Sequence, residues 1–507
     1  MTGKVWLVGA GPGDAGLMTL KGKQVLEQAD VVVYDALVGP GVLNMIPENA
    51  KLIFAGKRAG NHYLRQEETN RVLLEEAQKG QKVVRLKGGD PFLFGRGGEE
   101  LELLAENGIP FEVVPGITSA IAVPAYSGIP VTHRDCCSSV HIITGHRRAD
   151  TSLDIDFEAL VRTGGTLVFL MGISTLPEIC SGLLNAGMAA DTPAAVLEKG
   201  TRADQRRIGA TVSTLAEECD RQHVRTPAII VVGQVCALAD TFSWYEKLPL
   251  AGVRVLLTRP RELSSRLAAL LRREGAEVLE NPSIATVPLE SAEFEESLEK
   301  LSRGGYDWLV FTSPSGVRIF FGMLLERKDI RALGNVKVAA IGQGSEKALR
   351  SYGIRADYVP PVFDGETLGR ELRRICAPGE RLLIPRAKLG NQALIDELSR
   401  SGELEVTDLA AYDTVYVSSP VMDEKAAFAE GEIDYAVFTS ASTVKGFAAA
   451  VGDMDYSRVR AICIGKQTAS AAEALGMRVS VSEKATLPSL AECLRRTAQK
   501  DKEEERI

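Results

Sequence analysis

Short apolar runs alternate with amphipathic stretches along the whole chain. Four of the clearest runs lie at residues 31–34, 167–170, 229–232 and 253–257. Runs of this length are typical of buried strands, and the amphipathic stretches between them are typical of helices that cover a sheet. This alternation of strands and helices predicts an α/β architecture with mainly parallel sheets.

The chain has 507 residues, which is too long for one hydrophobic core and suggests roughly three to four domains. The clearest break lies at residues 244–252, where one unit ends before a new strand begins at Val253. All five histidines precede this break. The asymmetry indicates two modules of separate origin, which we place at residues 1–246 and 252–507.

The second module contains an internal repeat. The segment DWLVFTSPSGV at 307–317 is echoed by DYAVFTSASTV at 434–444, and VAAIG at 338–342 is echoed by RAICIG at 460–465. Two matching pairs in the same order predict two related α/β subdomains. Each repeat has a Thr-Ser pair after an apolar strand, where the next helix would start. A hydroxyl there can cap the helix, or the backbone amides can receive an anion, and the sequence leaves both possibilities open.

Composition narrows the class of protein. The net charge of −8 argues against a general nucleic-acid binder, because phosphate binding needs a basic face. No stretch approaches ~18 uninterrupted apolar residues, so we expect no membrane span. The eight cysteines are scattered without a CxxC pair or a Cys/His ligand spacing. This pattern predicts reduced thiols, a cytoplasmic location and no metal site.

Glycine-rich turns follow the predicted strands of the first module. GAGPGD at 9–14 comes directly after the first strand, and RLKGGDPFLFGRGGEE at 85–100 begins in another. A dinucleotide fingerprint does not fit, because it needs a third glycine where Asp14 stands and because Pro12 lacks an N–H for an amide cradle. Open α/β sheets bind ligands at the carboxyl ends of their strands, so these turns predict a ligand site.

Basic residues accompany these turns in an otherwise acidic protein, which suggests a polycarboxylate or phosphate substrate. The alternative is that most of them are solvated surface charges. They are Lys57, Arg58, Arg65, Arg85, Lys87, Arg96 and Arg134.

With these motifs, the first module resembles the uroporphyrinogen-III C-methyltransferases of the tetrapyrrole methylase family. The resemblance covers about residues 4–246 and is carried by GAGPGD, VVYDALV, GKR, RLKGGDPFLFGRGGEE, VPGITSA and GIPVTHR. It implies a tetrapyrrole methylase fold of two α/β subdomains, with S-adenosylmethionine (SAM) in the cleft between them, and a homodimer. The implied activity is the transfer of two methyl groups to ring carbons of uroporphyrinogen III, which yields precorrin-2.

The matching motifs also imply site residues. Asp35 and Lys57 would face the tetrapyrrole as catalytic residues, with Asp35 as the base that removes a proton after methylation. Asp35 could instead only cap the end of its strand. Arg134 is a candidate for binding the substrate. The residues expected to line the SAM pocket are Pro12, Gly88, Asp90, Leu93, Thr118, Ser119, Met171, Thr226, Pro227 and Ala228.

From Val253 onward the chain resembles uroporphyrinogen-III synthases. The resemblance is carried by LLTRP, YDWLVFTSPSGV, AAIGQGSEKAL, LLIPRA, AAYDTVY and DYAVFTSASTV. It implies two α/β subdomains joined by a two-stranded hinge, the first at about 252–287 plus 414–507 and the second at about 288–412. The implied reaction closes linear hydroxymethylbilane into a ring while inverting the last pyrrole, and it needs no cofactor.

Tyr412 matches the cleft tyrosine of the synthases and is the candidate catalytic acid, although it could equally be a packing residue of the hinge. The carboxylates of the product would be bound by hydroxyl and amide donors. The candidates for this role are Thr312, Ser313, Ser345, Ser440, Ser442 and Gly465.

Together the modules predict a bifunctional enzyme that acts on tetrapyrroles and uses SAM. Sirohaem synthases that resemble the first module carry a dehydrogenase and ferrochelatase ahead of it, so we expect another protein to supply oxidation and iron insertion. Two alternatives remain. The methylase could act on another precorrin, and the second module could bind tetrapyrroles without catalysis.

Overall fold

The computed structural model describes residues 2–47, 49–56, 65–146, 153–259, 261–400, 402–418 and 422–504, without the side chains of 261–265. The chain divides into two compact units. The larger unit comprises Met1–Asn281, Ser419–Val444 and Asp453–Ile507, and the smaller unit comprises Pro282–Ser418 and Lys445–Gly452. The larger unit carries three five-stranded sheets and the smaller unit carries one. The break predicted at 244–252 lies inside the larger unit, and the module boundaries stay a prediction.

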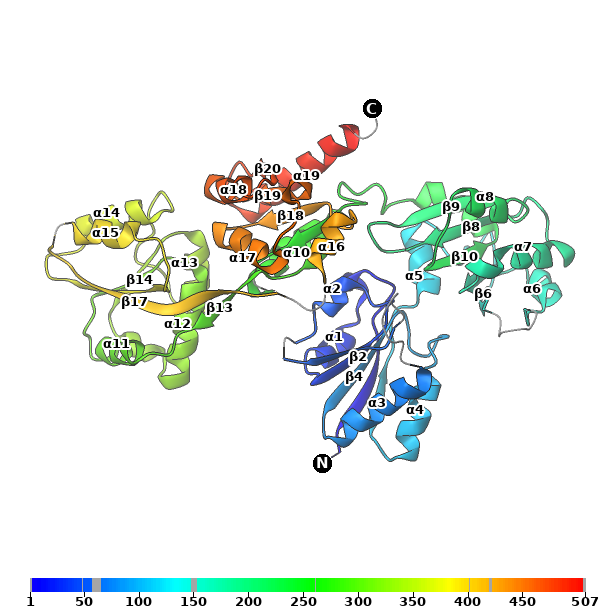
Figure 1. Ribbon diagram of the computed structural model, residues 1–507, viewed down its shortest axis with the longest axis horizontal. Coiled ribbons are helices and arrows are strands. Elements are labelled where there is room, and N and C mark those ends of the chain that lie inside the picture. Colours follow the sequence, from blue (N-terminus) through cyan, green and yellow to red (C-terminus); the bar gives the residue numbers. More distant parts are fainter. Residues whose placement is uncertain are drawn as a thin grey trace. The chain divides into compact units, whose positions relative to one another are not determined.

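The first sheet is parallel throughout, with strand order β3-β2-β4-β1-β5. Leu7 of β1 packs in one buried cluster and Val8 in another, so both faces of the sheet are covered. Because the strands run in one direction, their carboxyl ends share one edge (Figure 1). The elements are β1 (Lys4–Gly9), α1 (Leu20–Leu26), β2 (Val31–Tyr34), α2 (Pro40–Leu43), β3 (Lys51–Phe54), α3 (Gln66–Gln78), β4 (Lys82–Lys87), α4 (Gly97–Glu106) and β5 (Phe111–Val114).

The second sheet has the order β6-β7-β10-β8-β9, and only β6 and β7 pair in parallel. The expectation of mainly parallel sheets is wrong here. The short loop at 199–205 can return β9 only antiparallel to β8, and β10 is inserted antiparallel between β7 and β8. The elements are α5 (Ser119–Tyr126), β6 (Val140–Thr144), α6 (Phe157–Thr163), β7 (Thr166–Leu170), α7 (Leu176–Asn185), β8 (Pro193–Glu198), β9 (Arg206–Thr211), α8 (Leu215–Arg221), β10 (Ala228–Val232) and α9 (Ala239–Phe242).

The third sheet is again parallel, in the order β12-β11-β18-β19-β20. Its strands come from two separate parts of the chain, because the smaller unit is inserted after β12. The elements are β11 (Arg254–Leu257), α10 (Arg261–Arg273), β12 (Glu277–Glu280), α16 (Glu424–Ala429), β18 (Tyr435–Phe438), α17 (Ala441–Val451), β19 (Arg460–Cys463), α18 (Lys466–Glu473), β20 (Arg478–Val481) and α19 (Leu487–Glu504).

The fourth sheet, in the smaller unit, has the order β13-β17-β16-β14-β15. The chain enters by β13 and leaves by β17, and these two strands pair antiparallel with Pro288 opposite Tyr412. A hinge function for this pair stays a prediction. The elements are β13 (Ile284–Pro288), α11 (Ala292–Ser302), β14 (Trp308–Phe311), α12 (Pro314–Arg327), β15 (Lys337–Ala340), α13 (Gln343–Arg350), α14 (Gly365–Ile375), β16 (Arg381–Ala387), α15 (Ala393–Ser399) and β17 (Glu405–Tyr416).

The internal repeat predicted from the sequence is confirmed. One copy runs β14–α12–β15–α13 in the fourth sheet, and the other runs β18–α17–β19–α18 in the third. In each copy the two strands are parallel neighbours.

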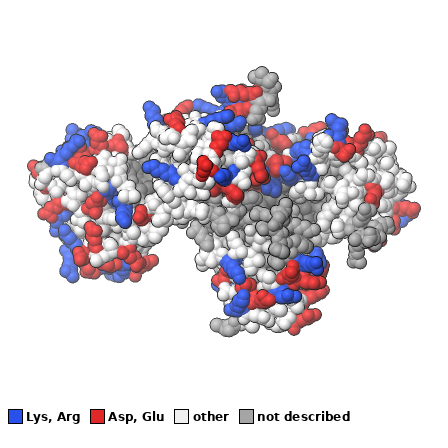
Figure 2. Space-filling model, in the orientation of Figure 1, with Lys and Arg blue, Asp and Glu red and all other residues white. Residues whose placement is uncertain are grey.

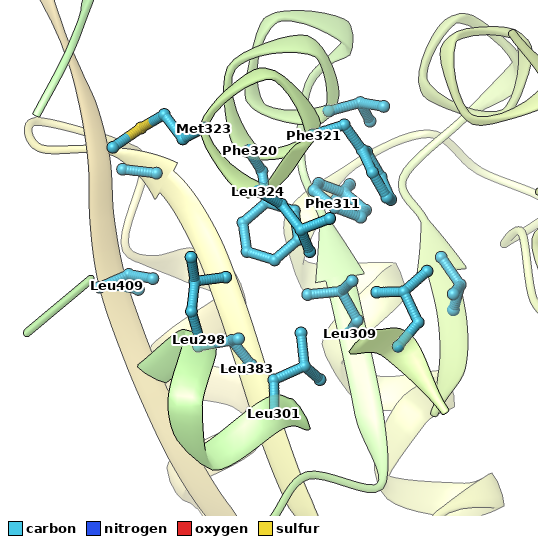
Figure 3. Close-up of a cluster of buried hydrophobic side chains, with 14 of the residues drawn as sticks. Leu298, Leu301, Leu309, Phe311, Phe320, Phe321, Met323, Leu324, Leu383 and Leu409 are labelled. Carbon is cyan, nitrogen blue, oxygen red and sulfur yellow. The ribbon is translucent and has the colours of Figure 1, made fainter. Parts of the chain in front are cut away.

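A cluster of buried hydrophobic side chains, with phenylalanines among them, holds the first copy together (Figure 3). Helix α12 carries apolar residues at positions 317, 320, 321 and 324, a spacing that places them on one face. The ring of Phe311 on β14 lies 5.6 Å from that of Phe320 and 5.8 Å from that of Phe321. This packing fixes the end of β14 against the start of α12, where the Thr-Ser pair lies.

On the face shown in Figure 2, Lys and Arg are interspersed with Asp and Glu, so this face has no large patch of one charge. No helix in the described part of the chain combines the length and apolar character that a bilayer crossing requires. All eight cysteines are free. Within the described ranges, no group of three or more His, Cys, Asp or Glu side chains is arranged to hold a metal ion.

Candidate functional site

Three glycine turns meet at the carboxyl edge of the first sheet. Gly9 ends β1, Gly89 follows β4 and Gly116 follows β5. A Cβ on Gly116 would stand 2.2 Å from the Gly89 carbonyl oxygen, and a Cβ on Gly9 would stand 2.4 Å from the Cα of Gly116. No side chain fits between backbones at these distances, so both positions require glycine.

Asp90 and Thr118 fix these turns through their side chains. Asp90 Oδ1 accepts hydrogen bonds from the amides of Phe92 (2.8 Å) and Leu93 (3.2 Å), and Oδ2 accepts one from the Gly116 amide at 3.0 Å. Thr118 caps α5 by accepting from the Ala120 amide at 3.3 Å. Both side chains therefore hold the backbone in place, and a ligand at this edge would meet mainly backbone groups.

Met171 lies at the edge of the second sheet where strand β7 ends. It follows the buried strand β7, is 49% exposed and has φ of +57°, a conformation that is strained for a residue other than glycine. Strand β10 pairs antiparallel with β7, with Ile229 opposite Leu170. The start of β10 therefore lies beside Met171, which brings residues 226–228 to the same edge. Leu93 packs against the core of this second sheet.

Asp35 stands at the end of β2, beside buried charges. Its Oδ1 accepts from the Leu37 amide at 3.0 Å, and its Oδ2 lies 3.6 Å from the Arg85 guanidinium. Arg85 and Lys87 are buried on β4 and both contact Glu100 of α4. Burial, followed by the charge of Arg85, lowers the pKa of Lys87. Asp35 is thus both a turn cap and the outermost member of a charged network.

A second polar group lies in the fourth sheet. Tyr412 is 6% exposed, and its hydroxyl lies 2.8 Å from Ser313 Oγ. Ser313 caps α12 by accepting from the Gly316 amide at 2.9 Å. Burial raises the pKa of Tyr412, against smaller opposite effects of Ser313, Arg318 and Arg386. A phenol is protonated at neutral pH even without this shift, so the hydroxyl carries a proton, and burial makes it a weaker acid than an exposed tyrosine.

The equivalent position in the third sheet is Ser440, at the start of α17. Its Oγ lies 2.8 Å from Ser442 Oγ and accepts from the Thr443 amide at 3.3 Å. Gly465 precedes α18 in extended backbone, and a Cβ there would meet nothing within 4 Å among the described atoms, so glycine is not required. Helix caps are thus the interpretation that the contacts support at both Thr-Ser pairs.

Comparison with known proteins matches both halves of the chain. Residues 4–216 match the family model "Tetrapyrrole (Corrin/Porphyrin) Methylases", and residues 265–492 match "Uroporphyrinogen-III synthase HemD". The porphyrin biosynthesis protein HemD of Ruminiclostridium josui is 46% identical over 490 residues, which cover 96% of this chain and 97% of that protein. The chain belongs to the tetrapyrrole methylase family in its first half and to the uroporphyrinogen-III synthase family in its second.

Two further relatives cover the first half alone. The siroheme synthase of Salmonella typhimurium is 54% identical over 243 residues, 48% of this chain and about half (52%) of that protein. The uroporphyrin-III C-methyl transferase of Thermus thermophilus, solved with S-adenosyl homocysteine, is 39% identical; the match covers 46% of this chain and 99% of that one, with a TM-score of 0.41. Both resemblances stated from the sequence, and the α/β fold class, are confirmed. We refer below to the methylase half, with the first two sheets, and the synthase half, with the third and fourth.

The structure places the predicted site residues of the methylase half in three groups. At the edge of the first sheet lie the half-buried Pro12, Gly88, Asp90, Thr118 and Ser119, with Asp35 beside them. At the edge of the second sheet lie Met171, Thr226, Pro227 and Ala228. Arg134 is exposed. Lys57 lies outside the described residues.

In the synthase half the structure brings Ser313 and Tyr412 together, with the half-buried Thr312 adjacent in sequence. Ser345 is almost fully buried, and its hydroxyl has no hydrogen-bond partner among the described residues. Ser440, Ser442 and Gly465 belong to the larger unit.

Sequence reasoning missed Glu100, the fully buried partner of Arg85 and Lys87. A signal was present in the helical spacing. Glu100 shares the inward face of α4 with Leu104, four residues later, whereas Glu99 points to solvent.

We predict opposite effects of two Gly→Ala substitutions. Gly116→Ala forces the junction apart and lowers stability by about 3 kcal/mol. Gly98→Ala, in α4, meets nothing within 4 Å among the described atoms and raises stability by about 0.5–1 kcal/mol, because alanine favours the helix. Hydrogen exchange of the β4 and β5 peptides in the full chain measures both changes. Equal protection in the two variants would contradict the junction.

Proposed function

We propose that this chain is a bifunctional enzyme that cyclises hydroxymethylbilane to uroporphyrinogen III and methylates the ring twice to precorrin-2. The observation that carries the proposal is the presence of both family matches on one chain, at 4–216 and 265–492. They belong together chemically, because the ring that a uroporphyrinogen-III synthase makes is the substrate of a uroporphyrinogen-III methylase. Precorrin-2 would supply sirohaem or cobalamin synthesis.

The methylase half presents groups that fit SAM as the methyl donor. Exposed apolar side chains lie on the loops after β2, β4 and β5, in the first turn of α5 and at the end of β7. They are Leu37, Phe92, Ile117, Ile121 and Met171. Backbone amides and carbonyls of the glycine turns lie among them. An apolar lining with a few fixed polar groups is typical of a small-molecule pocket. Bound there, SAM supplies an electrophilic methyl group.

For methyl transfer, the protein chiefly has to align the substrate, because a pyrrole carbon is already nucleophilic. The new carbon–carbon bond forms as the carbon–sulfur bond breaks, and the ring then releases a proton. Asp35 would accept this proton on Oδ2, since Oδ1 is occupied by the Leu37 amide. Lys57 remains the candidate for a second contact to the substrate.

For ring closure, Tyr412 would donate a proton to the hydroxyl that leaves hydroxymethylbilane, so that it departs as water. A tyrosine phenol is protonated at neutral pH even at its ordinary pKa, and the raised pKa of Tyr412 makes it a weaker but still protonated donor. The hydrogen bond between Ser313 Oγ and the Tyr412 hydroxyl holds the phenol in position. The hydroxyls and amides at the helix starts would bind the carboxylates of the product.

Three further features stay predictions: the module boundaries at 246 and 252, a cytoplasmic location, and a homodimer formed through the methylase half. Sedimentation equilibrium of the full chain, whose mass is 54.6 kDa, would decide the last of these.

A product assay tests the whole proposal. We expect hydroxymethylbilane alone to give the type-III ring in excess over the spontaneous type-I ring. With SAM added, mass spectrometry should show a gain of two methyl groups. Formation of only the type-I ring would make the synthase half a binding module. Type-III ring that is never methylated would give the methylase half another precorrin as substrate.

Removing the proposed base should abolish most methylation. We expect Asp35→Asn to lower the methyl-transfer rate at saturating SAM by roughly 100-fold or more, because the amide cannot accept the proton. Asp30→Asn is the matched control at the other end of β2, where the carboxylate accepts a hydrogen bond from the Lys82 amide at 2.8 Å. Wild-type rates in Asp35→Asn would leave Asp35 as a strand-end cap alone.

Removing the phenol hydroxyl should slow ring closure. We expect Tyr412→Phe to lower formation of the type-III ring at least about tenfold, with more type-I ring appearing, because the proton donor is lost. Tyr416→Phe is the control on the same strand, since Tyr416 is 54% exposed. An unchanged isomer ratio in Tyr412→Phe would assign Tyr412 to packing.

A further inference from the structure

Three charged side chains are buried directly behind Asp35. Arg85 and Lys87 lie two residues apart on β4, which places them on one face of the strand, and Glu100 reaches them from the first turn of α4. Glu100 is fully buried, and the two cations are nearly so. Buried charges are costly unless they are paired, so this arrangement must be maintained by its own contacts.

One oxygen atom of Glu100 makes all of these contacts. Its Oε1 accepts from Lys87 Nζ at 2.7 Å, from Arg85 Nε at 3.1 Å and from Gln66 Nε2 at 3.1 Å. Its Oε2 is buried without a hydrogen-bond partner among the described residues. The Glu100 carboxylate is therefore placed to hold two cations, and it is not shared with solvent.

The guanidinium of Arg85 is anchored through Nε and Nη1, whereas Nη2 faces Asp35. Nε binds Glu100, and Nη1 donates to the carbonyls of Leu86 (3.0 Å) and Val33 (3.4 Å). Because the group is planar and rigid, these anchors determine where Nη2 lies. Nη2 stops 3.6 Å from Asp35 Oδ2, beyond the 2.7–2.9 Å of a charge-assisted hydrogen bond.

We propose that Glu100 is a positioning residue for the methylation reaction, because it holds Arg85 back from Asp35. This inference rests on the proposed role of Asp35 as base. A carboxylate gripped by a bidentate guanidinium accepts a proton less readily, since the pairing stabilises its charged form. Because Glu100 binds Arg85, the positive charge of Arg85 stays near Asp35 without forming a close hydrogen bond to it. Oδ2 of Asp35 is then free to accept the proton that leaves the methylated ring.

The charges of the network fit this role. Arg85 and Lys87 contribute two positive charges and Glu100 one negative charge, so the buried group attracts the carboxylate of Asp35 with an excess of one. Replacing Glu100 by a neutral side chain would double that excess and weaken the hold on the Nε side of Arg85, because the hydrogen bond there would lose its charge assistance. The guanidinium could then close on Asp35.

The test uses the full chain and separates kcat from KM. We expect Glu100→Gln to lower kcat for methyl transfer roughly tenfold while KM for SAM changes less than about twofold, because the Glu100 side chain is fully buried among Arg85, Lys87 and Gln66. Glu99→Gln is the matched control on the next position of α4, where the exposed carboxylate pairs with Arg96 at 2.6 Å. It should leave both constants unchanged.

A double-mutant cycle shows whether Glu100 acts through Arg85. In an Arg85→Gln background we expect Glu100→Gln to change kcat less than about twofold, because no guanidinium remains to close on Asp35. Glu100→Asp keeps the charge but shortens the side chain by one methylene, so it should give an intermediate loss of kcat. If Glu100→Gln does not fold, the kcat of Glu100→Asp tests the positioning role in its place.

Two outcomes would overturn the inference: an unchanged kcat in folded Glu100→Gln or in Glu100→Asp, or an equal loss in both Arg85 backgrounds. Asp35→Asn, assayed in parallel, separates the two proposals. If it is inactive while the Glu100 variants match the wild type, only the positioning role fails. If it methylates at the wild-type rate, the base assignment fails and the positioning role fails with it.

Discussion

The close approach of three backbone turns at the end of the first sheet is the constraint on which the methylase site depends. Gly9 and Gly116 can stand this close only because neither has a side chain. The junction brings the ends of β1, β4 and β5 to one edge, and Asp90 ties two of these turns together. The result is an edge made mainly of backbone groups, and exposed apolar side chains lie on the loops beside it.

The synthase half uses one local device twice. Ser313 and Ser440 occupy equivalent positions of the internal repeat, and each accepts a hydrogen bond from the amide three residues later. Beyond this shared cap, the copies differ. Ser313 also binds the hydroxyl of Tyr412, whereas Ser440 binds that of Ser442. The repeat therefore supplies two similar scaffolds, and only one of them positions a candidate acid.

The sequence was sufficient to predict the strands, the repeat and the glycine turns at the sheet edge, because apolar runs, duplicated motifs and glycine turns are local signals. It did not predict the antiparallel second sheet, since an apolar run is the same in either strand direction. A motif also shows that a residue lies at a site without showing what its atoms bind. Asp90 and Thr118 lie where the motifs placed them, yet their oxygens bind backbone amides. Glu99 and Glu100 are the same residue type, and only their positions around helix α4 differ, which places Glu100 on the buried face.

The two halves solve a similar electrostatic problem in a similar way. Each has a buried arginine near its candidate catalytic group, and in each a carboxylate holds that arginine. Glu100 binds Arg85 near Asp35, and Asp408 binds Arg386, whose charge lowers the pKa of Tyr412 by less than Ser313 and Arg318 do. Burial outweighs these effects and raises the pKa of the phenol. A guanidinium that is already bound to one carboxylate attracts a second acidic group less strongly than an unpaired guanidinium does. In both halves, therefore, pairing with another carboxylate limits the charge that a buried arginine presents to the candidate catalytic group.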